Sequence, residues 1–248
     1  MTDWLTTLPA CDSTNSWALA HADACPHGHC VFTEAQQAGR GQAGRAWSAP
    51  PGCLTATIIL HLAQSDQVRL VALAAGLAVC HAIEDHCTET SVAIKWPNDC
   101  YLRDRKLAGI LCEARTHTQA KSGGLFIAVG IGLNRAVSWD SHDFDVPPIS
   151  LSEVTTPPEP VALLTSLRAY LLEAAGLITA GRSAALIEQV RGRDWLEGRA
   201  LQVDDGHRRI AGTGCGIDAE GQLLVATETG LTPIAAGTVR AHRSGLEV

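Results

Sequence analysis

The chain has 248 residues, of which 46% are hydrophobic and 18% charged, with 26 acidic against 19 basic side chains. The resulting formal charge of −7 argues against general nucleic-acid binding, which requires a basic surface. No apolar run approaches the length of about 18 residues that a membrane span requires. The first residues also lack the basic and then apolar pattern of a secretory signal. We therefore expect a cytoplasmic globular protein with neither DNA nor a membrane among its partners.

Nine cysteines are present, an odd number in a long chain without a secretory signal. This usage favours free, buried thiols in a reducing compartment over disulfides. The segment CPHGHC places four zinc-ligand types, Cys25, His27, His29 and Cys30, within six residues. Its spacings do not match the C-x₂₋₄-C and H-x₃₋₅-H pairs of structural zinc sites. We expect no structural metal there, and a metal bound by these four residues stays open as the minor alternative.

The first half of the chain predicts strands alternating with helices. Residues 11–22 read as a loop entering a helix that Ser13 or Thr14 can cap. Residues 66–86 form a second helical pattern. Apolar and β-branched runs predict strands over 30–35, 54–60, 92–96, 106–114 and 125–134.

The second half predicts two helices and then a change of character. The proline-rich stretch 155–160 leads into a helix that Gly176 can close, and a further helix lies within 182–191. From Gly198 onwards, short β runs alternate with tight turns, which indicates a small five-stranded barrel. The expected fold class is therefore α/β, a mixed sheet with flanking helices over 1–197 followed by a β-barrel domain over 198–248.

The stretch GRGQAGRAW, residues 39–47, nearly matches a nucleotide-binding P-loop. It departs at Arg45 and Ala46, which replace the lysine and the magnesium-binding hydroxyl, and the following residues cannot form a helix. Its backbone N–H groups, with Arg40 and Arg45, can still hold an anion, and Trp47 offers a flat face to an aromatic ring. The alternative is a solvated glycine turn with a core tryptophan.

Two further stretches place charged residues beside expected strands. In KWPND, residues 95–99, Pro97 stops a strand and Asn98-Asp99 form a turn, so that Lys95 and Asp99 project from the strand end. In KLAGIL, residues 106–111, Lys106 is either a solvated residue at the rim of the sheet or an anion ligand, and Gly109 indicates a close approach of ligand or backbone. The stretch GIGLN, residues 130–134, is a weak dinucleotide motif that serves equally well as a turn at a strand end.

Together with DSTN at 12–15, these stretches resemble the catalytic domain of bacterial biotin–protein ligases, which are related in fold to lipoate ligases. The family patterns are a G-R-G-R-x-G-R/K-x-W loop, a K-W-P-N-D turn and a K-x-x-G-I-L strand, and this chain has GRGQAGRAW, KWPNDC and KLAGIL in the same order. The segment GIDAEGQLLV resembles the small SH3-like barrel that ends these enzymes. The resemblance covers nearly the whole chain.

The resemblance implies an ATP-dependent, AMP-forming ligase. Biotin and MgATP would give biotinyl-5′-AMP, and the biotinyl group would pass to one lysine of the biotin carrier domain of acetyl-CoA carboxylase. No tightly bound prosthetic group is implied, and Mg²⁺ would arrive with ATP. Since there is no room for a DNA-binding domain before Asp12, we expect the monofunctional type, with a homodimer left open. The alternatives are a lipoate or octanoate ligase or transferase, and a non-catalytic biotin-binding protein.

The resemblance also assigns roles to residues. The implied catalytic residues are Arg40, Arg45, Asp99 and Lys106. Biotin would contact Ser13, Thr14, Asn15, Gln37, Gly41, Gln42, Ala43, Lys106 and Gly109. The adenylate would contact Arg40, Trp47, Asn98 and Asn134. One departure is notable, because the second arginine of the family loop is Gln42 here, and we expect the enzyme to release biotinyl-AMP faster as a result.

Overall fold

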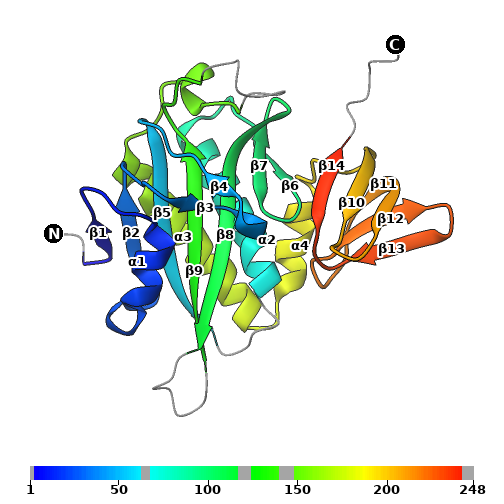
Figure 1. Cartoon of the computed structure of the whole chain (residues 1–248), viewed down its shortest axis with the longest axis horizontal. Coiled ribbons are helices and arrows are strands. Elements are labelled where there is room, and N and C mark those ends of the chain that lie inside the picture. Colours follow the sequence, from blue (N-terminus) through cyan, green and yellow to red (C-terminus); the bar gives the residue numbers. More distant parts are fainter. Residues whose placement is uncertain (1–2, 63–67, 117–123, 140–147, 242–248) are drawn as a thin grey trace.

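The computed structural model describes residues 3–62, 68–116, 124–139 and 148–241. These residues form a larger unit, built on one mixed sheet with helices on its faces, and a smaller unit of short strands beside it (Figure 1). The expected α/β class is confirmed, and so is the succession of a mixed sheet by a β-rich C-terminal part.

The larger unit is organised around a seven-stranded sheet in the order β1-β2-β5-β9-β8-β7-β6. Only the β1–β2 pair is parallel among its neighbours. The strands are β1 (Leu5–Thr7), β2 (Cys30–Thr33), β5 (Cys53–Leu62), β6 (Ala93–Lys95), β7 (Asp99–Leu102), β8 (Arg105–Thr116) and β9 (Leu125–Asn134). A separate two-stranded hairpin joins β3 (Gly39–Arg40) to β4 (Ala46–Trp47).

Helices cover both faces of this sheet. The main core packs one face against α2 (Val68–His86) and α3 (Pro160–Thr179), and α4 (Ser183–Arg191) joins the same core. The short helix α1 (Thr14–Ala20) covers the other face, where Ala18 packs near Ile59 and Phe126. Because α1 is only 7 residues long, much of that face stays uncovered beside its N-terminus, and this is where the candidate site lies.

The structure corrects two boundaries and adds strands that the sequence did not predict. Helix α3 continues through Gly176 to Thr179, and the left-handed residue that follows its end is Gly181, with φ of 68°. A helical glycine costs about 1 kcal/mol relative to alanine, and the packing of α3 offsets it. The expected turn at Asn98-Asp99 lies one residue too late, because the turn spans residues 96–98 and Asp99 already belongs to β7, where it pairs with Lys95.

Among the described residues, α3 is the one helix whose length and composition would allow it to cross a membrane. The sequence-based expectation that no segment comes near this threshold was therefore wrong for residues 160–179. Its apolar character has another explanation in the fold, since seven of its residues are buried and the helix packs against α2: Leu163, Leu164, Leu167, Leu171, Ala174, Ala175 and Ile178.

The smaller unit is a five-stranded antiparallel sheet in the order β13-β12-β11-β10-β14, which we call the barrel. Its strands are β10 (Ala200–Asp204), β11 (Arg209–Ile217), β12 (Leu223–Thr227), β13 (Gly230–Ile234) and β14 (Thr238–Ala241). Glycines with positive φ lie at the expected tight turns, with Gly206 and Gly221 between strands and Gly230 as the first residue of β13. The five short strands expected from Gly198 onwards are confirmed.

All nine cysteines are free thiols, and Cys215 on β11 is the exposed one among them. In the segment 25–30, His27 accepts a hydrogen bond from the His61 backbone N–H, and His29 hydrogen-bonds Thr6. Cys30 is buried in β2, and burial raises the pKa of its thiol to about 12. Within the described ranges, no three His, Cys, Asp or Glu side chains gather as metal ligands would.

Candidate active site

One cavity brings together the four stretches that the sequence singled out. Its volume is about 140 Å³, and it lies between the start of α1, the 39–47 loop and the faces of β8 and β9. The lining residues that the sequence had proposed are Ser13, Thr14, Asn15, Arg40, Gly41, Gln42, Arg45, Trp47, Asn98, Lys106 and Gly109. The cavity is also lined by residues that the sequence had not proposed as site residues, namely Gln36, Ala46, Thr55, Ile110, Leu111, Gly130, Ile131 and Gly132.

Four proposed site residues do not line this cavity, namely Gln37, Ala43, Asp99 and Asn134. Gln36 lies where Gln37 was expected, and its Oε1 accepts hydrogen bonds from the backbone N–H and the hydroxyl of Thr14, at 2.9 and 3.3 Å. The sequence offered no way to choose between adjacent glutamines in a loop. Ala43 faces a second cavity, formed by the loop and the barrel.

The start of α1 supplies the polar end of the cavity. Ser13 is the N-cap, and its Oγ accepts from the Ser16 backbone N–H at 3.4 Å, as the capping pattern predicts. Asn15 is fully engaged within the protein, because its Nδ2 donates to Leu111 O and Glu113 Oε2 while its Oδ1 accepts from Thr57. Ser13 keeps a hydroxyl hydrogen to donate, whereas Asn15 shapes the wall of the cavity.

The 39–47 loop is a tight hairpin in which Gly39 pairs with Trp47, and it ends in the short strand β4 where a P-loop would lead into a helix. Ala43 and Gly44 at its tip both have positive φ, of 54° and 73°. Arg40 Nη2 donates to Glu113 Oε2 at 2.8 Å and to Ser16 Oγ at 3.1 Å. Glu113 was not predicted as a site residue, because a glutamate late in an expected strand carries no pattern of its own.

The indole of Trp47 lies on two glycines that face each other across β8 and β9. Gly109 and Gly132 are register partners, and a Cβ at either position would collide with the indole ring. This explains the glycine inside the KLAGIL strand, although the group that comes close is the Trp47 side chain, where the sequence predicted a ligand or backbone. The Nζ of Lys106 lies 5.5 Å from the centre of a Trp47 ring, so cation and indole share one end of the cavity.

Lys106 forms an ion pair with Asp99, with 2.7 Å between Nζ and Oδ1. A register shift between β7 and β8 places it there, since Asp99 is opposite Gly109 while Tyr101 is opposite Lys106. Residues three apart on a regular strand face opposite sides, and one extra residue in a bulge restores them to the same side. The bulge therefore lets Lys106 and Gly109 line the same cavity.

Residues 9–134 match the family described as "Biotin/lipoate A/B protein ligase family", and this match covers half of the chain. The chain belongs to this family. It is 30% identical to the bifunctional ligase/repressor BirA of Escherichia coli, over 94% of this chain and 72% of that protein. It is also 30% identical to the biotin–[acetyl-CoA-carboxylase] ligase of Mycobacterium tuberculosis, over 92% of this chain and 85% of that protein.

Solved structures support the fold of this biotin/lipoate ligase family member. A biotin protein ligase from Aquifex aeolicus, in complex with biotin and ATP, is similar with a TM-score of 0.83 and 24% identity. That likeness covers 98% of this chain and 100% of the other. It includes the C-terminal part, which the family match over 9–134 does not reach.

Asn134 ends β9 in this ligase-family chain, two residues after Gly132 of the cavity lining. Its side chain is 1% exposed, and its Nδ2 donates to the backbone oxygen of Lys106 at 3.3 Å. Its Oδ1 is buried without a hydrogen-bond partner among the described residues. A buried acceptor without a partner costs about 1–3 kcal/mol, which a donor group on a ligand would recover.

Proposed function

We propose that this chain is a biotin–protein ligase, which activates biotin with MgATP to biotinyl-5′-AMP and then transfers the biotinyl group to a lysine of an acceptor protein. The observation that carries the proposal is the single cavity in which the glycine–arginine loop, Lys106 and the start of α1 meet. Family membership and the names of the similar proteins support the same reaction.

The first step joins two anions, the carboxylate of biotin and the α-phosphate of ATP, and releases pyrophosphate. Arg40, Arg45 and Lys106 supply positive charge to this cavity. Donors preorganised around charge that develops in a transition state are worth about 10²–10³ in rate each. In the structure, Arg40 forms an ion pair with Glu113 and Lys106 forms one with Asp99. These ion pairs preorganise the two cations for binding the carboxylate of biotin and the α-phosphate of ATP.

The cavity of about 140 Å³ is smaller than the roughly 300–1,000 Å³ of typical ligand pockets. Trp47 and the loop that carries Arg40 form much of its wall, and Arg40 is partly exposed. We infer that this loop moves outwards to admit biotin and ATP and then closes over the adenylate.

In the second step the ε-amine of the acceptor lysine attacks the carbonyl of the mixed anhydride, and AMP leaves. This step requires no nucleophilic side chain from the enzyme. Asp99 is the carboxylate beside Lys106, and its role in orienting or deprotonating the incoming amine stays a prediction.

Magnesium fits this site as a companion of ATP. Mg²⁺ usually keeps several waters and binds through one or two carboxylates together with substrate phosphates. Asp99 offers a carboxylate next to the cavity as a ligand for Mg²⁺. The side-chain oxygen of Asn98, which lines the cavity, is a second oxygen ligand that the ion could use. When bound, the ion would neutralise phosphate charge, while Lys106 and Arg40 orient the reacting oxygens.

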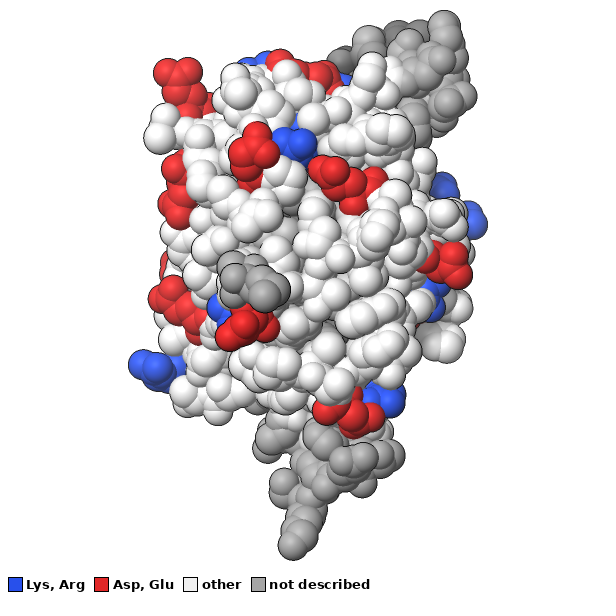
Figure 2. Space-filling model, turned by 90° about the vertical axis from the view of Figure 1, so that its left-hand side faces the viewer, with Lys and Arg blue, Asp and Glu red and all other residues white. Residues whose placement is uncertain are grey.

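The acceptor we propose is the biotin carrier domain of acetyl-CoA carboxylase, on the name shared by two of the relatives. A cytoplasmic location, a homodimer and the lack of a DNA partner stay predictions. On the face that Figure 2 shows, Lys and Arg side chains lie singly among acidic and uncharged residues and do not gather into a basic patch. A face of this kind does not favour nucleic acid.

The test is ATP–pyrophosphate exchange, measured with biotin and separately with lipoate. We expect exchange with biotin, its loss in Lys106→Ala, and a partial rate in Lys106→Arg, which keeps the charge and changes the reach. Arg208→Ala, in an exposed ion pair within the barrel, is the control. Pyrophosphate exchange with lipoate but not with biotin would show that the chain is a lipoate ligase. The absence of exchange with both acids would favour a non-catalytic biotin-binding protein.

A further inference from the structure

The hairpin that carries Asp99 and Lys106 is fastened to the C-terminal unit on both sides of this ion pair. On one side lies Trp96, in the turn before β7. Its side chain is 1% exposed, and its Nε1 donates to the backbone oxygen of Gly221, in the β11–β12 turn of the barrel, at 3.0 Å. The barrel thus holds the turn that precedes Asp99.

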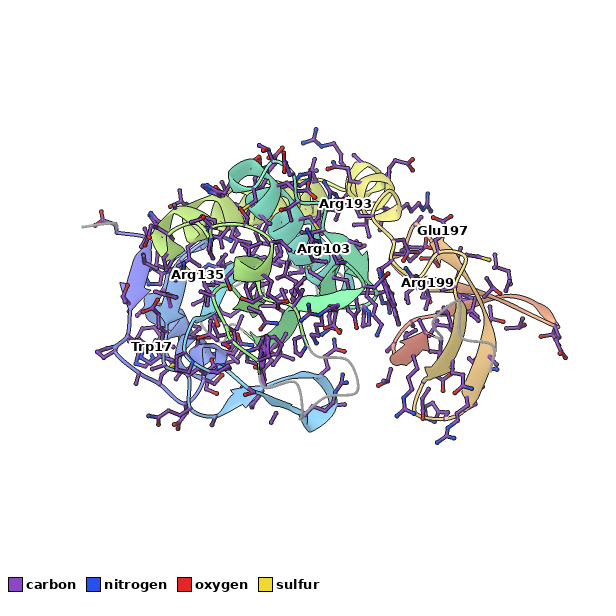
Figure 3. The ribbon with its side chains drawn as sticks, turned by 90° about the horizontal axis from the view of Figure 1, so that it is seen from above. Trp17, Arg103, Arg135, Arg193, Glu197 and Arg199 are labelled. Carbon is purple, nitrogen blue, oxygen red and sulfur yellow. The ribbon has the colours of Figure 1, made fainter. Side chains whose placement is uncertain are left out.

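On the other side lies the two-residue turn between β7 and β8, formed by Arg103 and Asp104. Both have positive φ, 49° and 58°, a conformation that costs side chains other than glycine of order 1 kcal/mol each. Asp104 Oδ1 accepts from Trp195 Nε1 at 2.7 Å and from Arg199 Nη2 at 2.8 Å. Figure 3 shows Arg199 in the segment that leads from the larger unit into the barrel.

The same segment packs against the strand opposite Lys106. The ring centres of Trp195 and Tyr101 are 4.6 Å apart, and Tyr101 is the register partner of Lys106. The Arg199 guanidinium lies 4.0 Å from the centre of the Trp195 ring on which it stacks. Trp195 therefore contacts both Arg199 and Tyr101, and it donates a hydrogen bond to Asp104, two residues before Lys106.

We propose that Trp195, Arg199 and Asp104 form a clamp that positions Lys106 for the adenylation step, so that the junction with the barrel takes part in the first half-reaction. The inference rests on the proposed function and adds positioning residues outside the cavity. None of the three residues lines the cavity, so they act through the β7–β8 turn and Tyr101.

The test compares Asp104→Ala and Arg199→Ala with matched controls. Asp104→Asn keeps an acceptor oxygen and tolerates positive φ, while Arg208→Ala removes an equivalent charge elsewhere in the barrel. A misplacement of about 1 Å can cost up to about 10²-fold in rate, so we expect a fall of about tenfold in kcat for biotin-dependent pyrophosphate exchange. KM for biotin should stay within about twofold, because the cavity wall is intact.

Two further results separate positioning from a general loss of structure. The double variant Asp104→Ala/Arg199→Ala should fall no further than either single variant, since both remove one clamp. Hydrogen–deuterium exchange should speed up over residues 99–106 in Arg199→Ala and stay unchanged in Arg208→Ala.

The inference is overturned if Asp104→Ala and Arg199→Ala keep the wild-type kcat, or if amide exchange over residues 99–106 does not change. If the wild-type chain shows no biotin-dependent exchange, the proposed function fails, and amide exchange alone then decides whether the clamp orders the hairpin.

Discussion

At the scale of single residues, the site depends on missing side chains as much as on charged ones. Trp47 lies flat on the sheet because Gly109 and Gly132 carry no Cβ where its ring passes. Lys106 then reaches over the indole, so that one surface offers an aromatic face and a cation together.

Replacing Gly132 with alanine tests this contact. The new Cβ collides with the indole of Trp47, so we expect a large loss of biotin-dependent exchange and a loss of stability of about 1–3 kcal/mol. Gly176→Ala in α3, where a Cβ meets nothing within 4 Å, should instead stabilise the protein by about 0.5–1 kcal/mol. Urea unfolding compares the two, and an unaffected Gly132→Ala variant would show that Trp47 is free to move aside.

Gln42 is the residue at which the loop departs from the family pattern. It lines both the main cavity and the cavity beside the barrel. We expect Gln42→Arg to slow the release of biotinyl-AMP, because a further cation would interact with the phosphate. Release is measured by trapping the free adenylate after a single turnover, and an unchanged rate would contradict the prediction.

The family resemblance proposed fifteen site residues, of which eleven line one cavity, and their roles in binding and catalysis stay predictions. It could not choose Gln36 over Gln37, because a loop has no fixed register, nor find Glu113, whose role depends on Arg40 folding back over β8. The positions of Gln36 and Glu113 both depend on contacts between segments that are distant in the sequence, and a local sequence pattern does not predict such contacts.

At the scale of elements, apolar periodicity predicted the long strands and helices but missed β1 and β7 of the seven-stranded sheet, as well as the two-residue strands β3 and β4. Each has at most four residues, and β7 follows directly on a turn, so that none shows a pattern of its own. The bulge opposite Tyr101 could not be read from the sequence either, although it decides which way Lys106 faces.

The segment between α4 and the barrel contains an acid with a shifted pKa. The pKa of Asp194 is raised from 3.8 to about 6, chiefly by burial; the N–H of Leu196 opposes this rise and the charge of Glu197 adds to it. Between these pH values the folded chain binds more protons than the unfolded chain. The free energy of unfolding therefore decreases as the pH rises through this window.

Asp194→Asn should remove that dependence. We expect the variant to be more stable than the wild type above pH 6, by about 1–3 kcal/mol, because no charge is left to bury. Below the unfolded pKa the two proteins should be equally stable. Urea titrations at several pH values measure the difference, and parallel curves for the two proteins would contradict the assignment.

At the scale of the whole molecule, the barrel and the larger unit share polar contacts as well as apolar ones. Arg69 of α2 donates to Ala235 O in the barrel at 3.0 Å, and Gly221 lies against Leu70 and Leu73 of the same helix. The tryptophan of KWPND belongs to this junction, which the sequence could not reveal because its partner lies 125 residues further along the chain.

Trp96→Phe keeps a buried aromatic ring, although a smaller one, and removes the indole N–H. Gly221 O then loses its donor, and we expect a loss of about 1 kcal/mol in stability. Hydrogen–deuterium exchange should also speed up in the β11–β12 turn, while β5 and β9 stay protected. Unchanged exchange in that turn would show that apolar packing alone holds the barrel.

The exposed thiol in the barrel, that of Cys215, is a site for selective chemical labelling. Six cysteines are buried and two are half-buried, whereas Cys215 on β11 is exposed. A maleimide dye should therefore react at Cys215 first, and all nine thiols should become reactive only in denaturant. The unaltered chain could then be tethered or labelled through its barrel, with fluorescence anisotropy following how an acceptor protein docks and leaves.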